Sequence, residues 1–144
     1  MSKTILCALD INRAGEEKEV LMTAANLAKA DGAQLDVITV VPDFGMSVVG
    51  AYFQDHQVDS AKTKASELLK ELTRDTLGAD RDAGIRHIVA MGTVYEEVLR
   101  AAKLGKSDLI VIGAHRPDLK DYLLGPNAAR VVRHSECSVY VVRH

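Results

Sequence analysis

The stretch GAHRPDLKDYLLGPNAARVV, residues 113 to 132, could be a phosphate-binding loop or an ordinary connection between a strand and a helix. Gly125 and Pro126 stand where a new helix should begin. Glycine is an acceptable N-cap, and proline loses nothing at the first helical position, where its missing N–H would have no partner. The next free amide, that of Asn127, would point out of the helix start. Together with the helix dipole it would form an anion site.

The residues before this helix start add a cation. Gly113 closes an apolar run, and the absence of a side chain lets the backbone come close to a ligand. Arg116 could reach a bound phosphate as a forked donor. His115 beside it could face the phosphates or the solvent. On spacing alone, an ordinary strand-to-helix connection with a good N-cap is a slightly better interpretation than a phosphate site.

Two further candidates follow other apolar runs. Asp10 comes directly after the first run, and its carboxylate could accept hydrogen bonds from an amino group or a hydroxyl of a ligand. It could equally cap the turn that follows, because aspartate favours such places. Val40 lies near the end of the second run, and by itself an apolar residue there indicates a core position.

Alternating strands and helices must position these residues. Short apolar runs predict strands at residues 4–11, 33–41, 85–92, 108–115 and 137–144, and helical periodicity predicts helices at 12–32, 57–78, 93–107 and 126–134. Gly32 and Gly105 should end the first and third helices. Thr93 and Glu96 have the spacing of a capping box. Residues 42 to 56 have no clear period and predict a loop.

This order predicts an α/β fold, with residues 1–144 as a single domain. Nearly continuous apolar strands are typical of a parallel sheet that helices cover on both faces. We therefore expect a doubly wound, five-stranded parallel sheet of the Rossmann-like type. In such a sheet ligands bind outside the carboxyl ends of the strands, where the strand order reverses. The segments that follow the first four strands should meet at that edge.

Composition excludes several classes of function. The chain has 144 residues, of which 47% are hydrophobic and 26% charged, with a formal net charge of −2. It has no basic field for nucleic acid, no apolar run that would span a bilayer, and no signal-peptide pattern, so we expect a cytoplasmic protein. Cys7 and Cys137 are interpreted as packed thiols rather than a redox pair. No metal-ligand spacing is present, and we expect no structural metal.

From KTILCALDIN to CSVYVVRH, the sequence resembles the universal stress protein family. The ATP-binding branch of that family has G-x-x-G, nine residues and G-[ST] where this chain has Gly113 and Gly125. Here Arg116 replaces the second glycine, eight residues follow it, and Pro126 replaces the Ser or Thr. The arginine-containing short loop and the ending YLLGPNAARVVRH are similar to the bacterial F/G-type subgroup, in which a serine occupies the position of Pro126.

The resemblance implies an adenine-nucleotide alpha-hydrolase-like fold that binds ATP, with Mg²⁺ as an optional companion. It places the adenine near Val40 and Asp10 and the phosphates near the glycines and Arg116. The implied nucleotide-binding residues are Ala8, Asp10, Val40, Ile112, Gly113, His115, Arg116, Gly125, Pro126 and Asn127.

The implied role is a regulatory or sensing module in the stress response, with at most slow ATP hydrolysis. The resemblance also implies a homodimer through residues 138 to 142, and leaves open whether dimers pair into tetramers. One alternative is a nucleotide-free dimeric interaction module, because Pro126 and the short loop alter the phosphate grip. Another is a phosphotransfer enzyme with Asp10 as nucleophile, but Asn12 stands where the second acid of such enzymes is required.

Overall fold

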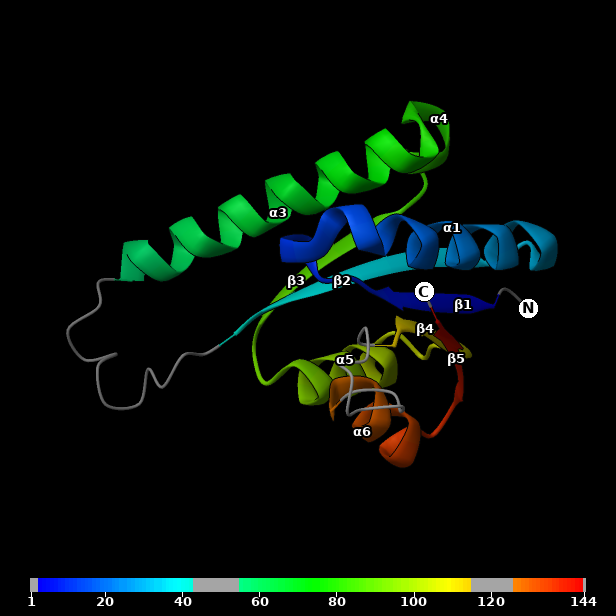
Figure 1. Cartoon of the computed structure of the whole chain (residues 1–144). Helices are drawn as coiled ribbons and strands as arrows, with labels where there is room; N and C mark the ends of the chain where they lie inside the picture. The colour runs from blue at the N-terminus through cyan, green and yellow to red at the C-terminus, as the bar shows by residue number, and fades with distance from the viewer. Residues whose placement is uncertain (1–2, 43–54, 115–125, 144) are drawn as a thin grey trace.

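The computed structural model describes residues 3–42, 55–114 and 126–143 (Figure 1). Its strands are β1 (Thr4–Ala8), β2 (Gln34–Pro42), β3 (Arg86–Gly92), β4 (Leu109–Gly113) and β5 (Ser138–Val142). Its helices are the short 3-10 helix η1 (Ile11–Arg13), α1 (Ala14–Asp31), α3 (Asp55–Leu77), α4 (Ala79–Asp82), α5 (Val94–Leu104) and α6 (Pro126–His134).

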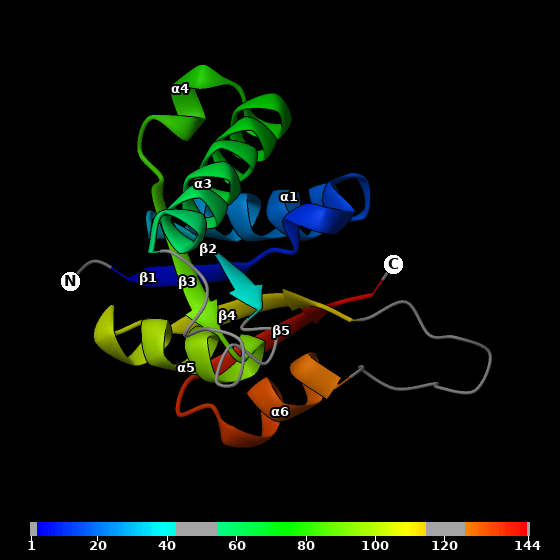
Figure 2. The same cartoon turned by 90° about the vertical axis from the view of Figure 1, so that its left-hand side faces the viewer.

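The five strands form one parallel sheet in the order β3-β2-β1-β4-β5. Helices α1, α3 and α4 cover one face, and α5 and α6 cover the other, as both views show (Figures 1 and 2). The chain thus adds β2 and then β3 on one side of β1, and afterwards adds β4 and β5 on the other side. The predicted doubly wound α/β sheet is confirmed.

The side chains of each strand divide between two hydrophobic cores. Along β1, Ile5 and Cys7 face the core under α1 and α3, whereas Leu6 and Ala8 face the core under α5 and α6. All four are at least nine-tenths buried. A strand that is apolar on both faces needs helices on both faces, which explains its continuous apolar sequence. None of the helices in the described ranges is long and apolar enough to cross a membrane.

Both cysteines are free thiols. Cys7 is fully buried, and this burial raises the pKa of its thiol well above the ordinary value. Cys137 is half-buried next to Ser135, whose Oγ lies 3.4 Å from its Sγ. They occupy the cores on opposite faces of the sheet, so the interpretation as packed thiols is confirmed.

The predicted helix ends are right in position, but one capping mechanism is wrong. Gly32 ends α1 in the left-handed conformation, with φ of 61°, which glycine adopts without strain. Thr93 is the N-cap of α5, yet its side chain makes no capping hydrogen bond. The Glu96 carboxylate instead accepts a hydrogen bond from the Tyr95 hydroxyl at 3.3 Å. Only the backbone carbonyl of Thr93 serves the helix, by accepting from Glu97 N.

Two short helices, η1 and α4, were not expected from the sequence. Helix α4 is held by a polar contact with the elements around it. Asp82 accepts from the Thr73 hydroxyl of α3 at 2.5 Å and lies 3.1 Å from Nε2 of His87 on β3. Such a tertiary contact leaves no periodic signal in four residues. Most of the loop predicted at 42–56 lies outside the described residues.

A buried carboxylate joins β2 to β3 at the amino edge of the sheet. The side chain of Asp36 is 2% exposed, and Arg86 forks onto it, with Nε to Oδ1 at 2.8 Å and Nη2 to Oδ2 at 2.6 Å. The Asp36 carboxylate raises the pKa of the Arg86 guanidinium above its ordinary value. The arginine is itself mostly exposed, so its main role is to satisfy the charge below it.

We predict that Arg86→Ala lowers the free energy of unfolding by roughly 1–3 kcal/mol, because the buried Asp36 carboxylate loses a charged partner. Urea denaturation followed by circular dichroism measures this change. The matched control is Arg81→Ala, which removes an exposed arginine of α4 and should stay within about 0.5 kcal/mol of the parent. Equal effects of the two substitutions would contradict the assignment.

Candidate functional site

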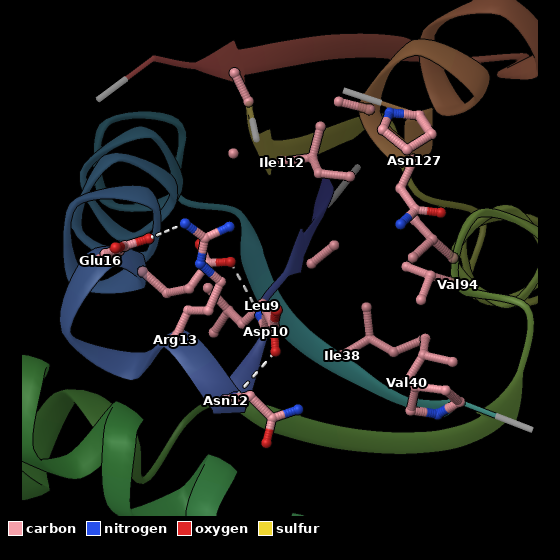
Figure 3. A pocket seen from close by; sticks show the side chains of 18 residues that line it. Leu9, Asp10, Asn12, Arg13, Glu16, Ile38, Val40, Val94, Ile112 and Asn127 are labelled. Carbon is pink, nitrogen blue, oxygen red and sulfur yellow. Dashed lines mark hydrogen bonds and ion pairs between the residues drawn. The ribbon is translucent and has the colours of Figure 1, made fainter. Parts of the chain in front are cut away.

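A cleft of about 250 Å³ opens at the carboxyl ends of β1, β2 and β4. The strand order reverses between β1 and β4, so the loops after these two strands turn to opposite faces and leave a crevice. The start of α1 forms one side of the cleft, and α5 and the start of α6 form the other (Figure 3). This is the edge at which the sequence predicted a ligand site.

The cleft brings together most of the predicted site residues. Seven of them line it, namely Ala8, Asp10, Val40, Ile112, Gly113, Pro126 and Asn127. Three others, His115, Arg116 and Gly125, lie outside the described residues. The described cleft therefore contains the predicted adenine and ribose positions, together with the helix start that borders the predicted phosphate position.

One wall of the cleft is apolar because of the alternation along the strands. Ala8, Ile38 and Ile112 are register partners on three neighbouring strands and face the α5–α6 side. Val40, two residues beyond Ile38, continues this face and is half-buried. The side chain of Val94 from α5 lies beside Ile38 and Val40 (Figure 3). Val40 is therefore both a core residue and a lining residue.

The opposite wall is polar and begins with Asp10. Its Oδ1 accepts a hydrogen bond from Asn12 N at 2.9 Å, which makes Asp10 the N-cap of η1. The interpretation of Asp10 as a turn cap is thus confirmed, and the same residue also lines the cleft. An exposed carboxylate held in this way could still accept from a ligand, because each carboxylate oxygen has two lone pairs.

Four polar residues of this wall were missed in the sequence: Asn12, Arg13, Glu16 and Glu17. Arg13 and Glu16, three residues apart in sequence, form an ion pair with Nη2 and Oε2 2.5 Å apart (Figure 3). Glu17 accepts a hydrogen bond from the backbone N–H of Asp10 at 3.1 Å. The signal that could have found them is their spacing, since residues three and four apart share a helix face just after a strand end.

The carboxyl group of Glu17 is perturbed by its position. Its pKa is raised from the ordinary 4.5 to about 7, mainly by burial and also by the neighbouring carboxylates of Asp10 and Glu16. The hydrogen bond from Asp10 N–H and the charge of Arg13 act in the opposite direction. Oε2 of Glu17 is buried and has no hydrogen-bond partner among the described residues. Glu17 is therefore a group whose charge changes near neutral pH.

The far wall contains the start of α6. Pro126 is the first residue of this helix, as predicted, and Asn127 follows it in the first turn. Both residues are exposed and line the cleft, so the first-turn amides, which have no partner within the helix, are at the cleft edge. Within the described ranges, no group of three or more His, Cys, Asp or Glu side chains could hold a metal ion.

Comparisons with known proteins agree with this fold. The sequence matches the Universal stress protein family over residues 1–143, and the chain belongs to that family. It is 28% identical over 149 residues to universal stress protein G of Escherichia coli O157:H7, covering 99% of this chain and 100% of the relative.

Solved structures show the same architecture. Universal stress protein UspA from Lactobacillus plantarum superposes with a TM-score of 0.75 at 22% identity, over 98% of this chain and 97% of its own. A universal stress protein in complex with cAMP has a TM-score of 0.66 at 21% identity, over 99% and 97% of the two chains. At these identities the structural likeness supports the fold alone.

The perturbed carboxyl of Glu17 predicts a pH-dependent change in stability. Its folded-state pKa of about 7 lies above the ordinary 4.5, so the folded state binds this proton more tightly than the unfolded chain. Stability should therefore be lost as the pH rises through this window. The Glu17→Gln side chain cannot ionise and should not show this loss. The unfolding free energy of Glu17→Gln minus that of wild type should therefore be roughly 1–3 kcal/mol larger at about pH 8 than at about pH 4.5.

Urea denaturation of both proteins across this pH range measures the difference. Glu19→Gln, an exposed change on the same helix, is the control and should follow wild type. A Glu17→Gln difference that is the same at every pH would show that the carboxyl does not titrate abnormally.

Proposed function

We propose that this chain is a cytoplasmic universal stress protein of one domain, residues 1–144, that binds ATP and acts as a regulatory or sensing module. The observation that carries this proposal is the cleft at the strand-order reversal, with one apolar wall, one polar wall and a helix start at its edge. The match to the universal stress protein family supports it, as does the complex of one structural relative with cAMP, an adenine nucleotide.

Each part of the nucleotide has a matching surface. The adenine would lie against the apolar wall of Ala8, Val40 and Ile112, at the carboxyl ends of three strands. Asp10 would accept from the adenine amino group or a ribose hydroxyl. The phosphates would lie toward Gly113 and the start of α6, where free amides and the positive end of the helix dipole favour an anion.

The predicted phosphate contacts also include His115, Arg116 and Gly125, which lie outside the described residues. We retain them in the proposed site from the sequence. Arg116 would supply charge that the usual glycine loop of the family leaves to backbone amides. Mg²⁺ would accompany the phosphates, held mainly by their oxygens.

The described side chains of the cleft support binding better than chemistry. No nucleophile of the cleft lies within reach of a paired general base among the described residues, and Asp10 has one oxygen engaged as a turn cap. We therefore propose at most slow ATP hydrolysis. A phosphotransfer role for Asp10 gains no support from this geometry.

Analysis of the purified protein tests the proposal. Denaturing the protein and chromatographing the supernatant should release an adenine nucleotide, or, if the cleft is empty, added MgATP should raise the melting temperature. Neither release nor a thermal shift would favour the alternative, in which the chain is a nucleotide-free interaction module. The Arg81→Ala protein serves as a second sample with an unaltered cleft.

We predict that Asn127→Asp weakens MgATP binding about five- to tenfold, because a negative charge at the start of α6 opposes the phosphates. Adenosine, which lacks phosphates, should bind both proteins within about twofold. Isothermal titration calorimetry measures both affinities. An acidic residue in the first turn suits the helix itself, so the fold should be preserved.

The control for this substitution is Ala129→Asp, which adds the same charge to an exposed position of α6 that does not line the cleft. It should change MgATP affinity little. If adenosine binding falls as much as MgATP binding in the Asn127→Asp protein, then Asn127 does not lie at the phosphate end.

We also propose that the chain forms a homodimer through β5. This strand is at the edge of the sheet, next to β4, and an uncovered edge offers unpaired backbone groups to a second copy. Tyr140 is 46% exposed on it, whereas Val139 and Val141 pack against the core under α6. A large aromatic side chain on an exposed edge is typical of an interface. Whether two dimers pair further is left to experiment.

We predict that Tyr140→Lys shifts the protein from dimer to monomer in sedimentation velocity, because it places a charge at the edge and removes the aromatic contact. Leu104→Lys is the matched control, since it replaces an exposed apolar residue of α5 that is 78% exposed. Only the β5 variant should dissociate. A Tyr140→Lys protein that sediments as a dimer would place the interface elsewhere.

A further inference from the structure

Glu17 occupies an unusual place for a carboxyl group. It is the fourth residue of α1 and lines the cleft, yet most of its side chain is removed from solvent. Oε1 accepts from Asp10 N–H at 3.1 Å, and this bond holds the backbone from which the Asp10 carboxylate extends. Oε2 is buried without a partner among the described residues. A charged oxygen in such a place costs more free energy than a protonated one.

The groups around Glu17 do not neutralise it. From the same helix and the turn before it come the carboxylates of Asp10 and Glu16 and the guanidinium of Arg13, which is paired with Glu16. From β1 comes the thiol of Cys7, which lies in the same core. Helix α3, which packs against α1, contributes apolar side chains such as Leu69 and Leu72 to this core. Two carboxylates thus oppose the Glu17 charge, against one cation.

We propose that Glu17 is a positioning residue of the cleft that takes up a proton when an anionic nucleotide binds, so that occupancy of the cleft is linked to pH. This rests on the proposed nucleotide-binding function and adds a proton as its second ligand. The phosphates bring negative charge to a cleft that already holds three carboxyl groups. Protonation of Glu17 removes one of these charges, and the same coupling makes nucleotide binding stronger at lower pH.

The proton balance is simple. One proton moves from solvent or buffer to Oε2, the oxygen without a partner in the described part of the chain, and no other bond changes. Oε1 keeps its lone pairs and continues to accept from Asp10 N–H. The neutral side chain therefore still positions Asp10 for the ligand, while its repulsion of Asp10 and of the phosphates disappears. Glu17→Gln imitates this neutral state at every pH.

Calorimetric titration with MgATP at about pH 6 and about pH 8 tests the proposal on three proteins: wild type, Glu17→Gln and Glu19→Gln. Wild type should bind MgATP up to about tenfold more weakly at about pH 8 than at about pH 6. Any pH dependence that the Glu17→Gln protein also shows is first subtracted from this change. Glu19→Gln should behave as wild type, because Glu19 is exposed and does not line the cleft. Glu17→Gln should bind at least as tightly as wild type at about pH 8.

A second measurement requires no variant. Titrations of wild type in two buffers with different ionisation enthalpies, at about pH 7.5 and with excess Mg²⁺, should reveal net proton uptake on binding. Binding of MgATP without proton uptake, and with equal pH dependence in wild type and Glu17→Gln, would overturn the role of Glu17 alone. No binding of MgATP by any of the proteins at either pH would overturn the nucleotide site and this inference with it.

Discussion

Burial of both faces of the parallel sheet is the constraint on which the rest of the structure depends. The residues of β1 supply two cores at once, with Cys7 under α1 and α3 and Leu6 under α5 and α6. Helices must therefore cover both faces, and a single chain can do this only if its winding reverses. The reversal at β1 and β4 separates the loops that follow these strands. The cleft is the space that this separation leaves at the strand ends.

The two walls of the cleft have different origins. The apolar wall continues the core under α5 and α6, because Ala8 and Ile112 follow the same alternation as the residues below them. The polar wall comes from the turn after β1, where Asp10 caps η1 and is itself held by Glu17. Adenine is less polar than ribose, as the apolar wall of the cleft is less polar than the opposite wall. The asymmetry of the cleft therefore favours an amphipathic ligand over a uniformly polar one.

Sequence patterns could predict the sheet, the long helices and the edge at which the site lies. Buried strands and amphipathic helices have periods that can be counted, and the place of Asp10 and Val40 at strand ends follows from strand order. Glu17 could not be assigned in this way, because its perturbation arises from burial and from neighbours that only folding brings together. The same holds for α4, which depends on a contact of Asp82 with Thr73 and His87. The capping box failed because the Glu96 side chain has another partner, the Tyr95 hydroxyl.

The ion pair of Asp36 and Arg86 lies at the amino edge of the sheet, at the end of the strands opposite to the cleft. The charges that stabilise the fold and the charges that face the cleft thus lie at opposite ends of the strands. Effects of substitutions at distant sites usually add independently. The carboxyl edge, where Pro126 begins α6, can accordingly accumulate changes while the amino edge maintains the fold. This division of labour would allow relatives with one architecture to diverge in what they bind.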